Sequence, residues 1–398
     1  MSTILNKHKL SDIAKVIRGV SYGSNDGQKR QLENHLPVLR AGNIQDCLLL
    51  EKDLVWVPNT KVSLDQLIKQ HDIIMCSSSG SSAVVGKSAR AESDWQGSFG
   101  AFCVGIRPEQ QKCDPSYLSH YLRSPAFTSW SSLSAGANIK NIRKSELEDF
   151  EIPLPPLPEQ KRIAAILDKA DSIRRMQQEA ARLTEELLRS VFLDMFGDPV
   201  TNPKGWEEVT IRDLVTEVKY GTSDKASYEG EYPVLRMNNI TYLGGWNLTD
   251  LKRIDIPEKE LSKYLVQKGD ILFNRTNSKE LVGKTAVYRR DDPMAYAGYL
   301  IRIRPNKQNN SEYIAAYLNS THGKKILESM CKNIVGMANI NAQELQEIPI
   351  LQPPMGLQNH YASIVTSVEK AKEKLKASSE VTDTLFNSLL QRAFAGEL

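Results

Sequence analysis

A proline-rich stretch, IPLPPLPEQ, spans residues 152–160 and is followed by a long run of helical periodicity. A related stretch, IPILQPPMGLQ, spans residues 348–358 and is followed by a second such run. Proline before a helix keeps the chain extended, and proline is tolerated at the first helical position. Each stretch therefore predicts a hinge and the start of a helix, and the two hinges divide the chain into two similar parts.

The two parts match each other at an offset of about 198 residues, as expected for an internal duplication. Between the matching anchors the sequences differ almost freely, which is typical of surface loops. The chain therefore contains two copies of one fold that carry different surfaces. The anchors include Tyr22-Gly23 with Tyr220-Gly221, Pro37-Val38-Leu39-Arg40 with Pro233-Val234-Leu235-Arg236, and Val85-Gly86-Lys87-Ser88 with Val282-Gly283-Lys284-Thr285.

Length and composition agree with a soluble protein of several domains. The chain has 398 residues, more than one hydrophobic core usually organises, with 40% hydrophobic and 25% charged residues. No stretch resembles a membrane span or a signal peptide, so we expect a cytoplasmic protein. Five cysteines without a Cys-x-x-Cys pair indicate neither a disulfide framework nor a zinc site. The net charge of +3 is small, so binding to DNA would need local clusters of charge or a partner subunit.

The two helical runs share one register, because apolar residues recur at spacings of three and four from both hinges. Such a period, sustained over four heptads, predicts two long helices that pair as an antiparallel coiled coil. The alternative is that each helix lies on its own domain, since an apolar stripe usually faces a core. The residues predicted to pair are Ile166, Ile173, Leu187, Val191, Ile364, Val368, Leu375, Leu385 and Leu389.

Within each part the pattern predicts a mixed α+β domain. Residues 73–76, 102–106, 271–273 and 300–303 are expected to be strands, and residues 115–123 and 311–319 short helices. The predicted organisation is a globular domain at 1–155, a central helix at 156–197, a second such domain at 198–353 and a second helix at 354–398.

This arrangement of variable domain, proline-rich hinge and long helix, written twice, resembles the specificity subunits of type I restriction-modification systems. The resemblance covers the whole chain, and its most specific part is the hinge at 152–160 with Arg162-Ile163-Ala164 behind it. It implies two target recognition domains, each reading one half of an asymmetric bipartite DNA site. It also implies that the paired helices set the spacing and dock two modification (methyltransferase) subunits, which restriction subunits join. The second hinge departs from the pattern, with Leu357 in place of Glu159, so equal partner contacts at the two ends are in doubt.

DNA contacts are expected in the loops that differ between the halves, because Arg and Asn can read base edges while Lys and Ser suit phosphates. For each residue the alternative is an ordinary solvated loop position. Arg236, in the repeated Pro-Val-Leu-Arg, suits a structural or phosphate role better than base discrimination. The candidates are Ser77, Ser79, Lys87, Arg90, Asn138, Lys140, Arg143, Lys144, Arg236, Asn274, Arg275, Asn277, Lys279, Lys284, Asn339 and Asn341.

Catalytic motifs are not found. The run Gly80 to Ser88 misses the spacing of a phosphate-binding loop by one residue, and a turn with an exposed lysine explains it better. The run Gln352-Pro353-Pro354-Met355 is no methyltransferase loop, and the six histidines show no ligand spacing. We therefore expect a non-enzymatic DNA-recognition protein without a metal or cofactor. The alternatives are an enzyme with an unrecognised site and a coiled-coil adaptor that does not contact DNA.

Overall fold

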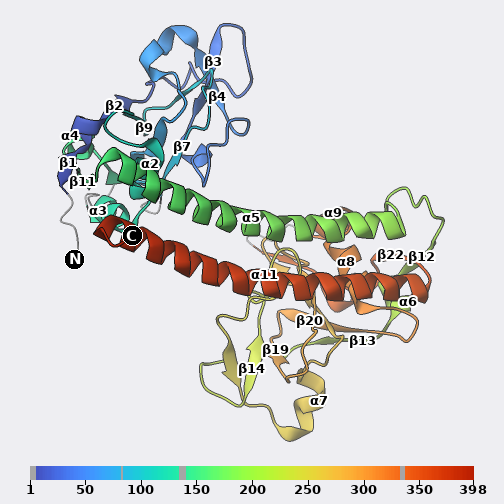
Figure 1. Ribbon diagram of the computed structural model, residues 1–398. Helices are drawn as coiled ribbons and strands as arrows, with labels where there is room; N and C mark the ends of the chain where they lie inside the picture. Colours follow the sequence, from blue (N-terminus) through green and yellow to red (C-terminus); the bar gives the residue numbers. More distant parts are fainter. Residues whose placement is uncertain (1–5, 82–83, 134–139, 332–336) are drawn as a thin grey trace. The chain divides into compact units, whose positions relative to one another are not determined.

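The computed structural model describes residues 6–81, 84–133, 140–331 and 337–398 (Figure 1). The chain divides into two compact units. Unit 1 comprises residues 1–179 and 377–398, and unit 2 comprises residues 180–376. This division differs from the four expected segments, because each long helix gives one part to each unit. Among the described helices, none is long and apolar enough to cross a membrane.

Unit 1 is built on an antiparallel four-stranded sheet, with a three-stranded sheet and two short ribbons beside it. The larger sheet has the order β2 (Ala14–Arg18), β9 (Cys103–Pro108), β5 (Ile73–Cys76), β7 (Ser88–Arg90). The smaller sheet has the order β4 (Val55–Pro58), β3 (His35–Leu39), β8 (Ser98–Phe99). The ribbons are β1 (Lys7–Lys9) with β11 (Glu151–Pro153), and β6 (Ser78–Ser79) with β10 (Lys140–Asn141).

The short helices of unit 1 start where the sequence supplies a cap or a proline. Asp114 accepts hydrogen bonds from the backbone N–H groups of Ser116 and Tyr117, and Pro115 occupies the first turn of α2. The helices are α1 (Leu10–Ile13), α2 (Pro115–Tyr121), α3 (Pro125–Leu133) and α4 (Lys144–Glu148), and the 3₁₀ turns are η1 (Ala41–Asn43), η2 (Asn59–Lys61) and η3 (Leu64–Gln66).

Unit 2 repeats this order of elements and both sheet topologies, which confirms the α+β duplication. Its four-stranded sheet is β13 (Val215–Tyr220), β20 (Leu300–Pro305), β16 (Ile271–Asn274), β18 (Thr285–Val287), and its three-stranded sheet is β15 (Lys252–Ile254), β14 (Tyr232–Leu235), β19 (Ala295–Tyr296). Its ribbons are β12 (Glu207–Thr210) with β22 (Pro349–Gln352), and β17 (Thr276–Asn277) with β21 (Ala338–Asn339). Its short helices are α6 (Ile211–Leu214), η4 (Glu258–Glu260), α7 (Leu261–Tyr264), α8 (Ser311–Asn319), α9 (Thr321–Met330) and α10 (Ala342–Gln346).

Both faces of the central strand β5 are buried, so its sequence is apolar throughout. Ile73 and Met75 pack with the helices of unit 1, whereas Ile74 and Cys76 pack with Phe99 of the smaller sheet. Alternate residues of a strand point to opposite faces, so each set belongs to a different core. The strand β16 of unit 2 is divided in the same way.

The two long helices are α5 (Leu157–Phe196) and α11 (Met355–Ala395), close to the predicted segments. In unit 1 the first part of α5 packs against the last part of α11, where Ile163 and Leu167 share a core with Phe386 and Leu390. In unit 2 the last part of α5 packs against the first part of α11, and the ring centroids of Phe196 and Tyr361 are 5.4 Å apart. The helices are therefore antiparallel within each unit (Figure 1).

The predicted pairing register is wrong by about one residue in several places. Ile173, Leu187 and Leu385 are 41%, 48% and 56% exposed, whereas Phe192 and Phe386 are buried. The reason is that each helix also packs on the globular core of its unit, as the alternative reading proposed, and this contact rotates the buried face. Of the other predicted residues, Val368 is buried, while Ile166, Val191, Ile364, Leu375 and Leu389 are half-buried.

Two buried glutamines join the hinges to the helices α2 and α8. Gln160 accepts a hydrogen bond from the backbone N–H of Asp114 and donates to the carbonyl oxygens of Lys112 and Pro155. Gln358 makes the equivalent bonds to Asn310 N–H and the Pro353 carbonyl. Both side chains are at most 1% exposed. The glutamine common to both hinges is therefore the structural lock, and Glu159 instead pairs with Arg162 at the surface.

The repeated Pro-Val-Leu-Arg motif is explained by a buried asparagine three residues beyond it. Asn43 accepts a hydrogen bond from the backbone N–H of Arg40 and donates to the carbonyl oxygens of Leu49 and Lys52. Asn239 makes the equivalent bonds in unit 2 with Arg236 N–H and the carbonyl oxygens of Asn247 and Asp250. The motif therefore fixes a loop in both units.

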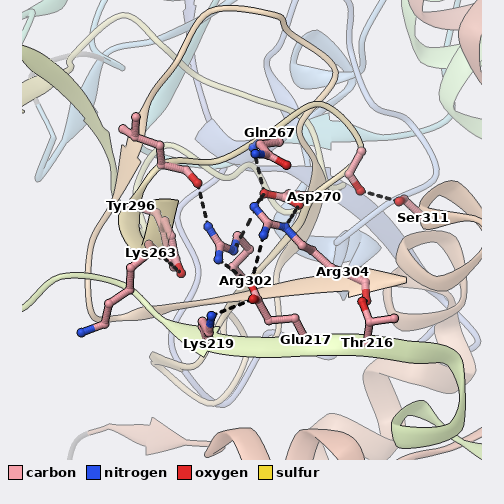
Figure 2. A network of polar contacts seen from close by, with 12 residues as sticks. Thr216, Glu217, Lys219, Lys263, Gln267, Asp270, Tyr296, Arg302, Arg304 and Ser311 are labelled. Carbon is pink, nitrogen blue, oxygen red and sulfur yellow. Dashed lines mark hydrogen bonds and ion pairs between the residues drawn. The ribbon is translucent and has the colours of Figure 1, made fainter. Parts of the chain in front are cut away.

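A buried ion network lies between the two sheets of unit 2 (Figure 2). Arg302 is fully buried, donates to Glu217 and to the Leu265 carbonyl, and lies with its guanidinium carbon 5.3 Å from the centre of the Tyr296 ring. Arg304 donates to Asp270 at 2.8 Å. Buried charges are stable only when they are paired, and this network supplies the pairs.

Candidate nucleic-acid interface

Three neighbouring strands of unit 1 end at one edge of the larger sheet. Because β2, β9 and β5 are antiparallel, the last residue of β2, the residue before β9 and the residue after β5 lie together there. These residues are Arg18, Phe102 and Ser77. The Gly19 N–H donates to the Cys103 carbonyl at 3.2 Å, and the Ser77 N–H donates to the Phe102 carbonyl at 2.9 Å. We call these three positions the strand-end edge of unit 1.

Unit 2 has the same edge with different side chains. Tyr220, Tyr299 and Arg275 occupy the three positions at the ends of β13, β20 and β16. The Gly221 N–H donates to the Leu300 carbonyl at 3.2 Å, and the Arg275 N–H donates to the Tyr299 carbonyl at 3.0 Å. The backbone bonds are thus the same in both units, whereas Arg, Phe and Ser in one unit become Tyr, Tyr and Arg in the other.

These bonds correct one sequence alignment. Gly19 and Gly221 are equivalent, because an added Cβ would lie 2.1 Å from the Gly100 oxygen in one unit and 2.4 Å from the corresponding Ala297 oxygen in the other. Tyr220 therefore corresponds to Arg18, and its expected match with Tyr22 is wrong. The sequence alignment matched the identical Tyr-Gly pairs, but strand pairing shows that the residues equivalent to Tyr220-Gly221 lie four positions earlier in unit 1.

A short ribbon adjoins each strand-end edge and brings the predicted DNA-binding segments together. In unit 1, β6 pairs with β10, and the Ile142 N–H donates to the Ser77 carbonyl at 2.8 Å. In unit 2, β17 pairs with β21, and the Ile340 N–H donates to the Arg275 carbonyl at 2.9 Å. The two segments chosen in each half of the sequence thus lie side by side.

Arg275 is held in place at the edge of unit 2. Its guanidinium carbon lies 4.8 Å from the centre of the Tyr220 ring, a cation–π contact. The Tyr220 hydroxyl in turn accepts a hydrogen bond from the backbone N–H of Ala342 at 2.8 Å. Such a contact orients a guanidinium without using its hydrogen-bond donors, of which Nε is buried here.

Four other candidates stand at or near the ribbon of unit 2. Asn277 and Asn339 lie in its two strands, and the Thr276 hydroxyl donates to the Asn339 side-chain oxygen at 3.2 Å. Lys279 is exposed and pairs with Glu328 at 3.7 Å. Asn341 caps α10 by accepting from the backbone N–H groups of Gln343 and Glu344, which assigns its side-chain oxygen to the fold.

The candidates of unit 1 are placed as follows. Ser79 and Lys140 pair across the ribbon, and Lys87 donates to the Gln45 side chain at 2.5 Å. Arg143 is exposed at the start of α4, and Lys144 pairs with Glu148 at 3.4 Å. Asn138 lies outside the described residues.

Three candidates are buried, and their assignment to DNA contact is wrong. Ser77 is 5% exposed and donates its hydroxyl to the Phe102 carbonyl, and Asn274 is fully buried. Lys284 is 7% exposed and donates to the Met237 and Ile240 carbonyl oxygens at 2.8 and 2.5 Å. Burial lowers the pKa of the Lys284 amine. The expected turn is present, with Gly86 and Gly283 at φ of 87° and 77°, but its lysine is buried in unit 2.

Two further candidates are engaged elsewhere. Arg90 pairs with Ile73 across β7 and β5, at the end of β5 opposite to the strand-end edge, and it contacts Glu92 at 3.6 Å. Arg236 donates to Asp250 at 2.9 Å, which agrees with the structural role expected for it.

Sequence reasoning missed Arg18, Phe102, Tyr220 and Tyr299 as surface residues of this edge. Phe102 was expected to begin a buried strand, yet it is 68% exposed, because β9 starts one residue later. Tyr299 is 55% exposed at the equivalent position. A signal was present in the sequence: an aromatic residue precedes the same apolar strand in both copies.

Comparisons with known proteins agree with this duplicated architecture. The family model described as "Type I restriction modification DNA specificity domain" matches twice, at residues 5–185 and 203–382. The specificity subunit of the type I restriction enzyme EcoKI from Escherichia coli (strain K12) is 30% identical, over 98% of this chain and 88% of its own length. The specificity subunit of StySPI from Salmonella potsdam is also 30% identical, with the same two coverages.

Solved structures show the same fold. The type I restriction-modification S subunit from M. genitalium superposes with a TM-score of 0.58 at 16% identity, covering 99% of this chain and 97% of the other. A chain from a study of complex assembly and conformational transition in a type I R-M system has a TM-score of 0.54 at 18% identity, with full coverage of both chains.

Proposed function

The chain belongs to the family of type I restriction-modification DNA specificity proteins, and we propose that each of its units reads one half of an asymmetric, bipartite DNA sequence. The observation that carries this proposal is the pair of strand-end edges. Their backbones are equivalent, but the positions that are not buried hold Arg18 and Phe102 in one unit and Tyr220, Arg275 and Tyr299 in the other, where Arg275 takes the place of the buried Ser77. Equivalent frames with different side chains are suited to two different half-sites.

The bonds and charges at these edges support direct reading of bases. Arg275 is oriented by the Tyr220 ring, and no ion pair or hydrogen bond from its guanidinium is found among the described residues. A guanidinium of this kind is the commonest reader of guanine in the major groove. Asn277 and Asn339 stand in the adjoining ribbon, where an amide can read adenine. Lys87, Arg143 and Lys144 suit backbone phosphates in unit 1.

We propose that the protein performs no chemistry itself and needs no cofactor, and that it acts in the cytoplasm with two modification subunits and, in the larger complex, restriction subunits. Exposed apolar side chains on the long helices support a docking surface there. Met176, Leu183 and Leu187 on α5, and Val381 and Leu385 on α11, are 48% to 69% exposed. Exposed apolar side chains of this kind support a protein interface in each unit, with Met176, Val381 and Leu385 in unit 1 and Leu183 and Leu187 in unit 2.

The two units differ beside these helices, which favours unequal docking. Unit 2 has a groove of about 570 Å³ that Phe192, Leu193 and Val365 help to line. At the equivalent place in unit 1, Asp171 is 5% exposed and pairs with Arg123, Arg174 and Arg175. Burial raises the pKa of Asp171, but the three guanidinium groups outweigh it and hold the pKa below its usual value.

Mapping of methylated bases tests the function. The chain is expressed with its modification subunits in a host that lacks other methyltransferases, and all methylated adenines are located in the genome. We expect one split, asymmetric motif with a spacer of fixed length. A contiguous motif, or no motif, would refute the proposal, and methylation by this chain alone would refute the non-enzymatic role.

The helices are proposed to set the spacer. Four residues inserted after Leu183, with four more at the matching level of α11, lengthen both helices by about 6 Å, close to two base-pair steps. The mapped motif is expected to gain about two spacer base pairs while both half-sites stay unchanged. An unchanged spacer in an active variant would rule out this role.

A further inference from the structure

Phe102 and Tyr299 each stand at the tip of a tight turn just before a buried strand. The Cys103 N–H donates to the Gly100 carbonyl at 2.8 Å, and the Leu300 N–H donates to the Ala297 carbonyl at 2.9 Å. The aromatic residue is thus the third residue of a four-residue turn in both units. The next residue is buried in both cases, with Cys103 at 1% and Leu300 at 0% exposure. The turn therefore presents the ring to solvent while it anchors the strand.

The duplication distinguishes these rings from ordinary exposed apolar residues. A single exposed hydrophobic side chain is common on protein surfaces and needs no explanation. Here the two copies differ at the neighbouring positions, where Arg18 and Ser77 correspond to Tyr220 and Arg275, yet both keep a large exposed ring at the tip. The fold does not require this ring, because more than half of it lies in solvent.

The surroundings of the rings show what they could meet. The carbonyl of Phe102 accepts from the Ser77 and Ser78 N–H groups at 2.9 and 3.1 Å, so the tip lies beside the ribbon β6–β10. The Tyr299 carbonyl is bonded in the same way to Arg275, at the start of the ribbon β17–β21. In unit 2 the ring stands beside Arg275, and in unit 1 it stands beside Ser77 and Ser78. In both places an exposed ring is suited to the 5-methyl group of thymine, the one apolar feature on the major-groove edge of a base pair.

We infer that Phe102 and Tyr299 are specificity-determining residues, and that each ring packs against the 5-methyl group of a thymine in the half-site that its unit reads. This inference rests on the proposed function and adds to it an apolar contact that the charged and amide residues cannot supply. It predicts one thymine in each half-site whose methyl group contributes to binding.

The experiment uses the full chain assembled with its modification subunits, and duplexes that carry the mapped target. Each thymine in turn is replaced by deoxyuridine, which removes only the methyl group. For the unaltered complex we expect deoxyuridine at one position in each half-site to weaken binding by about three- to tenfold. This corresponds to the free energy of burying one methyl group or slightly more. In the complex with Phe102→Ala, deoxyuridine at this position of one half-site should no longer change the affinity for DNA. In the complex with Tyr299→Ala, the same should hold for the other half-site.

A matched control is Tyr228→Ala, because Tyr228 is 72% exposed in unit 2 but lies outside the strand-end edge. It should leave every deoxyuridine effect unchanged. The dependence of binding on salt should be the same in all variants, since no phosphate contact is removed. Both edge variants should fold as the unaltered chain does, which circular dichroism checks.

The outcomes separate this inference from the proposed function. If the unaltered complex shows no sequence preference, the proposed function fails. Suppose that the sequence preference is intact, but the losses of affinity caused by deoxyuridine and by Phe102→Ala multiply when the two changes are combined. The ring then does not contact that methyl group, and the inference is overturned. A loss of affinity that is equal on target and unrelated DNA, or a change in both half-sites from one substitution, overturns it as well.

Discussion

The same place between the two sheets is filled in different ways in the two units. In unit 1, Gly105 of β9 lies under the Phe99 ring, and an added Cβ would be 2.6 Å from that ring. In unit 2 the equivalent residues are Arg302 and Tyr296, whose charged and aromatic groups stack. One unit closes the space with an apolar contact, and the other closes it with a guanidinium that needs several acceptors (Figure 2). The fold thus depends on filling this space and on the strand order, and either chemistry satisfies both.

The largest effect is expected from Arg302→Met. The change leaves Glu217 with only Arg304 and Lys219 and leaves the Leu265 carbonyl unpaired, so unfolding should become easier by about 3–5 kcal/mol. Denaturant unfolding of the purified chain measures this, and hydrogen exchange should place the loss in β16 and β20. Lys268→Met is the control, because Lys268 and Asp291 form an exposed pair worth less than about 1 kcal/mol. Equal losses in the two variants would show that the network does not stabilise unit 2.

A smaller effect, similar in both units, is expected at the glutamine locks. Gln160→Leu and Gln358→Leu each leave a backbone N–H and carbonyl oxygens buried without partners, which should cost about 2–3 kcal/mol. Gln178→Leu, at an exposed position of α5, is the matched control. Denaturant unfolding should give nearly equal losses for the two locks. A loss in only one of the two variants would mean that the two glutamines contribute unequally to the free energy of unfolding.

Gly105→Ala tests the apolar contact between Gly105 and the Phe99 ring in unit 1. The new methyl group would press on the Phe99 ring, and overpacking of this kind costs about 1–3 kcal/mol. Phe99→Leu added to Gly105→Ala should restore part of the loss, as thermal unfolding would show. Gly42→Ala is the control, since nothing lies within 4 Å of its added Cβ. If the double variant is no more stable than Gly105→Ala alone, the ring is not the obstacle.

The smallest effect is a dependence of stability on pH. Burial raises the pKa of Glu217, but hydrogen bonds from Lys219 and Arg302 and the charges of Arg302 and Arg304 outweigh it, so the pKa is lowered. A carboxyl group with a lowered pKa stabilises the fold above its unfolded pKa, about 4.3 for glutamate, and loses this contribution as the pH falls through the folded value. Glu217→Gln should therefore lose stability at neutral pH and show a weaker decline on acidification. An unchanged acid profile in thermal unfolding would contradict this.

Much of the architecture could be predicted from the sequence, because it depends on patterns that repeat. The two hinges locate the starts of α5 and α11 to within a few residues, and the apolar runs locate the central strands. The pairing register of the long helices could not be predicted, because Phe192 and Tyr361 use the same apolar stripe for the helix pair and for the core of unit 2.

The candidate site was harder to predict, because polarity alone does not distinguish a surface loop from a buried turn. Lys284 and Lys87 occupy equivalent positions of one motif. Lys284 donates to two carbonyl oxygens inside unit 2, whereas Lys87 donates to the Gln45 side chain at the surface. The pairing of β6 with β10, and of β17 with β21, joins segments that are distant in the sequence, and only strand pairing reveals it. Phe102 was expected to belong to a buried strand because the residues that follow it along the chain are core residues.

The division of the long helices also bears on the order in which the units can fold during synthesis. Unit 2 is one continuous segment, residues 180–376, so all its parts are available before residues 377–398 are translated. Unit 1 is begun first but completed later, because Phe386, Leu390 and Ala393 cover Ile163 and Leu167. During synthesis, Ile163 and Leu167 of unit 1 therefore stay uncovered until residues 377–398 have been made, which happens after the whole of unit 2. A nascent chain released before that point would offer these apolar residues to other proteins, so chaperone binding at Ile163 and Leu167 would mark incomplete copies.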